Sequence, residues 1–145
     1  MKRRSLGITL AMLAMLVMAS AAQAGAPTSP FSGSWMGQDP MPWDGGDGSW
    51  NHLEVRGGNN ARVDFQDEFG SVCWDAGATD FWFSSSLSGS VSGNTMTSVF
   101  KSAKCGHLSL SWMRGTTHTW TFNDQGTADP ADDTLWDGYV SWFRV

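Results

Sequence analysis

The chain has 145 residues, among them 17 Gly, 9 Trp and 2 Cys, and a net charge of -5 at pH 7. This length supports one globular domain, and 41% hydrophobic with 16% charged residues excludes a disordered or low-complexity chain. The sequence contains no internal repeat, which excludes solenoids and propellers. Its excess of acidic residues argues against a protein that binds nucleic acid through phosphate contacts.

The first 24 residues have the pattern of a secretory signal peptide. Basic residues at 2–4 precede an apolar run at 6–18, and Ala-Gln-Ala at 22–24 matches a cleavage site. The run is shorter than a membrane-spanning helix requires. We therefore predict a signal peptide over 1–24 and a secreted or periplasmic protein with no membrane insertion after cleavage. Arg3-Arg4 leaves twin-arginine export as an alternative, but the residues that follow favour the general secretory route.

Cleavage of this leader would make the chain more acidic. All three leader charges are basic, so the mature protein would carry a net charge of -8. Such a surface favours cationic or neutral partners and repels anionic membranes and nucleic acids.

Two cysteines, Cys73 and Cys105, lie in the part of the chain predicted to be exported. An oxidising compartment permits one intramolecular disulfide between them. In the loop-entropy model such a bond stabilises the fold by about 3–4 kcal/mol. A metal site would require more soft ligands, and a redox pair is more often C-x-x-C. We expect a structural disulfide.

Alternation of apolar and polar residues predicts strands throughout the mature chain. His118, Trp120 and Phe122 alternate with three threonines, and Phe81 and Phe83 begin a run that alternates with serines. Gly- and Asn-rich turns separate such runs. The predicted strands are near 33–38, 49–56, 61–68, 70–75, 80–91, 94–103, 107–113, 116–123 and 134–144.

This spacing predicts an all-β fold: an antiparallel up-and-down meander of eight or nine strands, closed into a small barrel so that no edge stays exposed. An open sandwich is the alternative. We expect residues 25–32 to form an extended leader and residues 33–145 a single barrel domain. Glycines leave the strand register open around 70–80 and 134–140.

Two short motifs at the ends of the predicted barrel carry a family resemblance. Gly33-Ser34-Trp35 opens the first strand, and Trp142-Phe143-Arg144 closes the last. This pair resembles the calycin pattern of lipocalins and avidins, and the chain is similar to short secreted bacterial barrels with two cysteines. The resemblance implies that Arg144 packs over the ring of Trp35 and closes one end of the barrel, a cation–π contact. The C-terminal helix of lipocalins is absent, and the residues of the avidin biotin site have no match here, so the resemblance implies no ligand.

Nine tryptophans are the most unusual feature of the composition, and most of them are expected in the core. Three depart from the core pattern. Trp82 lies on the serine face of its strand, Trp43 in a Pro/Gly loop, and Trp50 opposite Leu53 and Val55. An exposed Trp is costly unless it is used, so Trp43, Trp50 and Trp82 are the candidate ligand or partner contacts.

The sequence gives weaker evidence for metal-binding or catalytic residues than for contact residues. Asp39, Asp44 and Asp47 gather in one loop, but their spacing does not match a calcium loop, and solvated turn acids are favoured. Three histidines, which we expect to be structural, lie in different strands: His52, His107 and His118. No catalytic motif is found, so we expect no enzyme activity, cofactor or metal.

Two functions remain open. The first is a secreted, non-enzymatic binding barrel that uses exposed aromatics or the barrel mouth to bind a small apolar molecule or a glycan. The alternative is a protein-interaction module, such as an inhibitor of a secreted hydrolase, that would use the loop at 39–48. In the first case the partner is a small ligand or glycan, and in the second a secreted protein.

Overall fold

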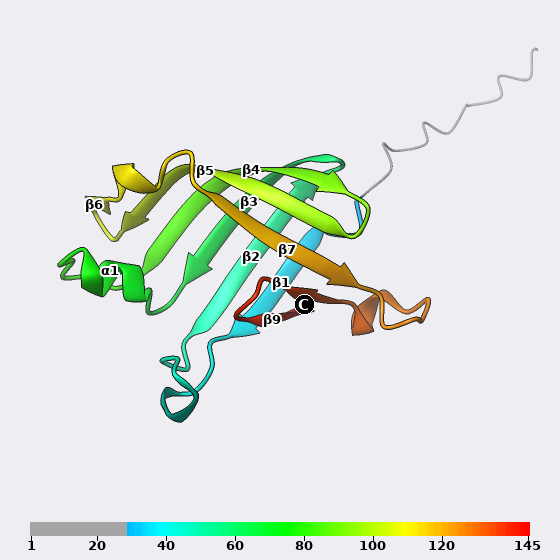
Figure 1. Cartoon of the computed structure of the whole chain (residues 1–145), viewed down its shortest axis with the longest axis horizontal. Coiled ribbons are helices and arrows are strands. Elements are labelled where there is room, and N and C mark those ends of the chain that lie inside the picture. Colours follow the sequence, from blue (N-terminus) through cyan, green and yellow to red (C-terminus); the bar gives the residue numbers. More distant parts are fainter. Residues whose placement is uncertain (1–28) are drawn as a thin grey trace, which may run out of the picture.

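Nine antiparallel strands form one sheet, and eight of them close into a barrel (Figure 1). The computed structural model describes residues 29–145. The strands are β1 (Gly33–Gln38), β2 (Trp50–Gly57), β3 (Asn60–Asp67), β4 (Phe83–Ser92), β5 (Thr95–Cys105), β6 (Leu108–Ser109), β7 (Thr117–Asn123), β8 (Thr134–Trp136) and β9 (Ser141–Arg144). One short helix, α1 (Ser71–Asp75), and three 3-10 turns, η1 (Pro42–Asp44), η2 (Ser111–Met113) and η3 (Pro130–Asp132), complete the fold.

Two pairings complete the ring: one joins the first strand to the last, and the other joins β4 to the strand that follows it. β1 pairs with β9, and β4 pairs with β5, while the short β6 extends the sheet beside β5. The remaining neighbours follow the chain as a meander. The predicted closed antiparallel barrel is therefore confirmed.

Side chains that alternate inward fill the barrel. Trp35, Trp120 and Trp142 are its largest fully buried residues, and His118 and Phe122 share the inward face of β7 with Trp120. Large rings pack there because burial of an aromatic side chain removes more apolar area from water than that of any aliphatic residue. The centre of the barrel is therefore filled with side chains.

One end of the barrel is sealed. Residues 29–32 turn across it, and Phe31 is fully buried against Phe122. Arg144 lies over the ring of Trp35, 4.2 Å from its centroid, as the resemblance of the two motifs to the calycin pattern implies. The Arg144 guanidinium also donates hydrogen bonds to the carbonyls of Pro30 and Ser32. Residues 29–32, the described part of the predicted extended leader, are therefore packed into this end of the barrel, and we call them the N-terminal plug.

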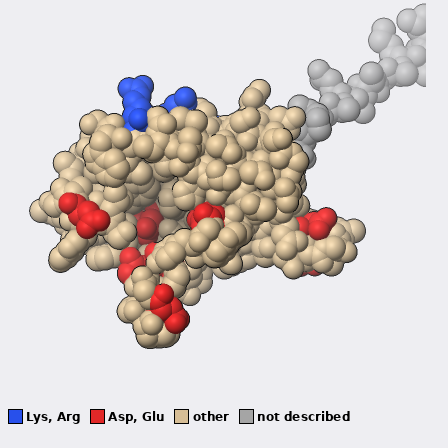
Figure 2. Space-filling view, in the orientation of Figure 1, with Lys and Arg blue, Asp and Glu red and all other residues tan. Residues whose placement is uncertain are grey.

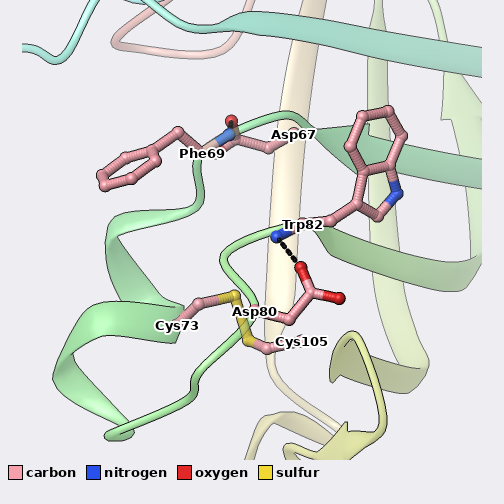
Figure 3. Close-up of a disulfide and its surroundings, with 6 residues drawn as sticks. All are labelled: Asp67, Phe69, Cys73, Asp80, Trp82 and Cys105. Atoms are coloured by element: carbon pink, nitrogen blue, oxygen red, sulfur yellow. Dashed lines mark hydrogen bonds between the residues drawn. A yellow bond between two sulfur atoms is a disulfide. The ribbon is translucent and has the colours of Figure 1, made fainter.

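The disulfide between Cys73 and Cys105 is present, as predicted (Figure 3). It joins α1 to the end of β5, with the two Cα atoms 5.6 Å apart, and both cysteines are buried. It fixes α1 against the barrel.

Two predicted strands are wrong because local turns replace them. Residues 71–75 form α1, which begins after Gly70, where an added Cβ would lie 2.7 Å from the Cβ of Phe83. Gly70 thus packs directly against the start of β4. Residues 107–113 contain only β6 and the turn η2, so Trp112 is exposed instead of sharing a face with Leu110.

The predicted strand at 134–144 is two strands. The carboxylate of Asp137 accepts hydrogen bonds from the backbone N–H groups of Tyr139 and Val140, and Gly138 has a φ of +97°. This side-chain-capped turn reverses the chain between β8 and β9.

The predicted signal peptide, residues 1–24, lies outside the described residues. Among residues 29–145, no helix is long and apolar enough to cross a membrane.

Candidate functional site

The open end of the barrel is lined by polar residues that continue the inward alternation of the core. Asp39 follows Trp35 and Gly37 on β1, and Asp67 follows Phe65 on β3. His118 precedes Trp120 on β7, and Asp137 follows Leu135 on β8. Alternate residues of a strand face the same side, and Asp39 and Asp137 lie one residue beyond the ends of β1 and β8, so these four side chains meet at one end. We call this end the mouth.

Asp137 holds the wall of the mouth together. Its Oδ2 accepts a hydrogen bond from Trp142 Nε1 at 3.1 Å and lies 3.3 Å from His118 Nε2. Burial alone would raise the pKa of Asp137, but the hydrogen bonds from His118 and from two backbone N–H groups outweigh it and keep the pKa below its usual value. Asp137 is therefore an ionised structural carboxylate.

The pKa of Asp39 is shifted in the opposite direction. Its Oδ1 accepts one hydrogen bond, from Asn51 Nδ2 at 2.6 Å. Burial raises the pKa of Asp39 to about 6 despite that bond, and the nearby carboxylates of Asp67 and Asp47 add to the rise. Burial likewise raises the pKa of Asp67, although Ser49 and the N–H of Phe69 donate to it. Strongly shifted groups in a cleft are typical of functional sites.

Two cavities open at the mouth and share Ser71. The inner cavity, about 290 Å³, reaches the barrel interior, and the rim cavity, about 310 Å³, lies between α1, the β1–β2 loop and the β8–β9 turn. The inner cavity is lined mainly by Phe65, Asp67, Phe83, Phe100, Met113 and His118. The rim cavity is lined mainly by Asp39, Asp47, Phe69, Trp74, Asp75 and Tyr139. Figure 2 shows acidic side chains around the hollow beside α1, with basic ones only at the upper edge of this face.

A larger groove of about 680 Å³ runs over the outer face of β1–β5. Its polar residues are the outward-facing serines and charged side chains of these strands, as expected for the solvent side of a barrel. Its charges compensate one another: Arg56 lies 3.6 Å from Glu54 and 3.4 Å from Asp64. The mouth, where Asp39 and Asp67 have no ion-pair partner among the described residues, is the stronger candidate.

The three tryptophans predicted as contacts lie apart from the mouth cavities. Trp43 is 79% exposed at the tip of η1. Trp50 points outward from β2 and packs edge-to-face on Phe143, with ring centroids 6.2 Å apart. Trp82 is partly exposed before β4, its indole directed away from the disulfide (Figure 3). None of the three lines either cavity, and their role as contacts stays a prediction.

The sequence reasoning missed Trp74, Tyr139 and Asp39 as site residues. Trp74 was assigned to a strand that is instead α1, and it is 66% exposed. Asp39 was expected to be a solvated turn acid, but it is half-buried. A usable signal was present, because continuing the inward alternation two residues beyond Gly37 and Phe65 leads directly to Asp39 and Asp67.

In the described part of the chain, no group of three or more His, Cys, Asp or Glu side chains has a geometry that could hold a metal ion. No protein-family model, curated protein or solved structure matches this chain.

Proposed function

We propose that this protein is an exported, non-enzymatic binding protein that takes a small ligand at the open mouth of its barrel. The difference between the two ends of the barrel carries the proposal. Phe31 and the Arg144–Trp35 contact seal one end, whereas two cavities open at the other. Concave sites lined by apolar side chains and a few polar groups are typical of ligand binding, and barrel mouths are a common place for them.

The rings at the mouth indicate what the ligand presents to the protein. Phe69, Trp74 and Tyr139 are each at least 40% exposed, and all three line the rim cavity. Exposed rings of this kind suit a flat apolar group or the apolar face of a sugar.

Binding is favoured over catalysis because the serine next to the histidine at the mouth is not accessible. His118 is engaged by Asp137, and its cross-strand neighbour Ser98 is fully buried. A nucleophile must be reachable by its substrate as well as close to a base. Ser98 cannot be reached by a substrate, because it is fully buried.

Export and the calycin relationship are further parts of this proposal. The Cys73–Cys105 disulfide supports export, because such bonds persist mainly in oxidising compartments. The barrel closed by β1 and β9, with Arg144 over Trp35, supports the calycin relationship.

The exposure of Trp43 favours the second candidate, a protein-interaction module that uses the loop at 39–48. A Trp that is 79% exposed at a loop tip can insert into a pocket of a partner protein. In that case Trp43→Ala would abolish partner binding and leave small-ligand binding at the mouth unchanged.

The proposal is tested by screening the oxidised protein against a mixed library of neutral, anionic and cationic small molecules by ligand-observed NMR. Ser71→Trp fills the mouth from a residue that lines both cavities, and Ser92→Trp, at the exposed last residue of β4 at the sealed end, is the matched control. We expect hits that Ser71→Trp abolishes and Ser92→Trp preserves. A library without hits, or hits insensitive to Ser71→Trp, would overturn the proposal.

A further inference from the structure

Three carboxylates line the rim cavity without a cation to balance them. Asp39 and Asp47 come from the β1–β2 loop, and Asp75 is the last residue of α1. Among residues 29–145, no Lys, Arg or His nitrogen lies within ion-pair distance of any of the three. Water can balance the exposed Asp75, but Asp39 is half-buried and has only the amide of Asn51 as a partner. The protein thus leaves a negative charge uncompensated inside a cavity.

Aromatic rings line the same cavity independently of these acids. Trp74 is 66% and Tyr139 49% exposed, so part of each ring is open to a ligand. Both are held in place: Trp74 stacks on Phe81 with centroids 5.6 Å apart, and the Tyr139 hydroxyl donates to the carbonyl of Gly45 at 3.3 Å. Phe69, the third ring, packs on Phe81 at 4.9 Å.

The disulfide holds the α1 side of the rim cavity in place. Cys73 lies directly before Trp74 and ties α1 to the end of β5. A ring and a carboxylate on a helix of five residues would otherwise have little to hold them. The cavity is therefore preorganised across three separate segments.

We propose that the rim cavity binds a small organic ammonium ion, with the carboxylates of Asp39, Asp47 and Asp75 on one side of the cation and the rings of Trp74, Tyr139 and Phe69 on the other. This inference rests on the proposed function and names its ligand class. Alkylammonium groups bind through the combination of aromatic faces and negative charge, because the ring quadrupole attracts the cation while the alkyl groups are removed from water. A cavity of about 310 Å³ has room for such a group.

The two simpler occupants fit less well. A bare divalent metal requires several oxygens converging on one point, and no such cluster exists among the described residues. A neutral apolar molecule would leave the charge of Asp39 uncompensated and further desolvated.

The inference makes binding dependent on pH. The pKa of Asp39, raised to about 6 by burial, falls when a cation binds beside it, so binding weakens as pH decreases from 7.5 to 5. The groups that face Asp39 are Asn51 on β2, Asp67 at the end of β3, Asp47 in its own loop, and Asp137 and Tyr139 of the β8–β9 turn. Asp67, whose pKa burial also raises, acts in the same direction as Asp39.

The experiment compares choline with its neutral isostere 3,3-dimethylbutan-1-ol by NMR titration of the oxidised protein at pH 7.5 and pH 5. Choline has a permanent charge, so only the protein titrates. We expect choline to bind at least about fivefold more tightly than the alcohol at pH 7.5, and to lose that advantage at pH 5. Asp39→Asn should weaken choline binding about three- to tenfold, and Asp124→Asn, which removes the same charge at the sealed end, should not.

A second pair of variants tests the rings. Trp74→Ala should weaken choline at least about fivefold, whereas Trp112→Ala, which removes a ring of similar exposure (64%) outside the rim cavity, should leave it unchanged. Equal affinity for choline and the alcohol, or choline binding that persists in Trp74→Ala and Asp39→Asn, would overturn the inference. Library hits that are neutral or anionic and blocked by Ser71→Trp would overturn it as well but keep the proposed function, whereas the loss of all mouth-dependent hits would overturn both.

Discussion

The guanidinium of Arg144 lies 4.2 Å over the ring of Trp35, and these two residues are also direct partners in the β1–β9 pairing that closes the barrel. The same guanidinium binds the carboxylate of Asp133 at 2.8 Å and the carbonyls of Pro30 and Ser32. One side chain thus joins the first strand, the last strand and the N-terminal plug.

We expect Arg144→Ala to lower the free energy of unfolding by about 2–4 kcal/mol, because it removes a cation–π contact and leaves the buried Asp133 unpaired. Arg144→Lys should recover less than half, since an ammonium cannot make the forked hydrogen bonds of a guanidinium. Urea unfolding followed by tryptophan fluorescence measures both. A loss under about 0.5 kcal/mol for the alanine variant, the range of ordinary surface substitutions, would contradict this role.

Replacing both cysteines, as Cys73→Ala with Cys105→Ala, should lower the free energy of unfolding by about 3–4 kcal/mol, because the bond spans 32 residues of chain. The variant should also lose amide protection in α1 before it does so in β1–β3, since the bond is what ties α1 to β5. Hydrogen exchange of the native state resolves the two regions. Uniform loss of protection would show that the disulfide does not act locally on the mouth.

The raised pKa of Asp39 makes its contribution to stability depend on pH. Its pKa is higher in the folded protein, about 6, than the ordinary value of 3.8, so the folded state favours the protonated form. That contribution is fully present below pH 3.8 and is lost as pH rises through 6. Asp39→Asn mimics the protonated form, so we expect it to stabilise the protein by about 1–2 kcal/mol at pH 7.5, after allowance for solvent screening, and by nothing at pH 3.5.

Denaturant unfolding of wild type and Asp39→Asn at several pH values between 3.5 and 8 checks this expectation. Asp124→Asn, an exposed carboxylate at the other end, serves as the control and should show no such dependence. A stabilisation that is the same at pH 3.5 and pH 7.5 would show that ionisation of Asp39 is not its cause.

Two buried serines should respond oppositely to removal of the hydroxyl. Ser98 is fully buried, and its Oγ has no hydrogen-bond partner among the described residues, whereas the Oγ of Ser85 donates to the carbonyl of Phe65. Ser98→Ala should therefore stabilise the protein by up to about 1 kcal/mol, and Ser85→Ala should destabilise it by about 1 kcal/mol. Thermal and urea unfolding of the two variants decide the sign. Destabilisation by Ser98→Ala would mean that its hydroxyl has an ordered partner.

Much of the barrel could be predicted because its strands carry their own pattern. The alternation around Trp120 predicts β7 with its inward face, and β1 lies where the sequence places it, at 33–38. The two cysteines could be paired because no alternative partner exists in the chain. These features are local or exclusive, so a single sequence determines them.

The mouth could not be predicted in the same way. The stretch at 71–75 is α1, next to Gly70, which packs on Phe83 of β4, and alternation along the chain does not report such a tertiary contact. The state of Asp39 depends on Asn51, Asp67 and Asp137, which belong to other strands and turns. Tyr139 reaches the rim only because the Asp137 turn directs the chain back.

The sequence by itself therefore predicted most of the strands, the closed antiparallel barrel and the pairing of Cys73 with Cys105. The tertiary structure decided which polar side chains share a cavity and which carboxylate is half-buried without a cation. Alternation and turn chemistry act between near neighbours in the chain, whereas desolvation and charge coupling depend on distances in space that only the closed barrel establishes.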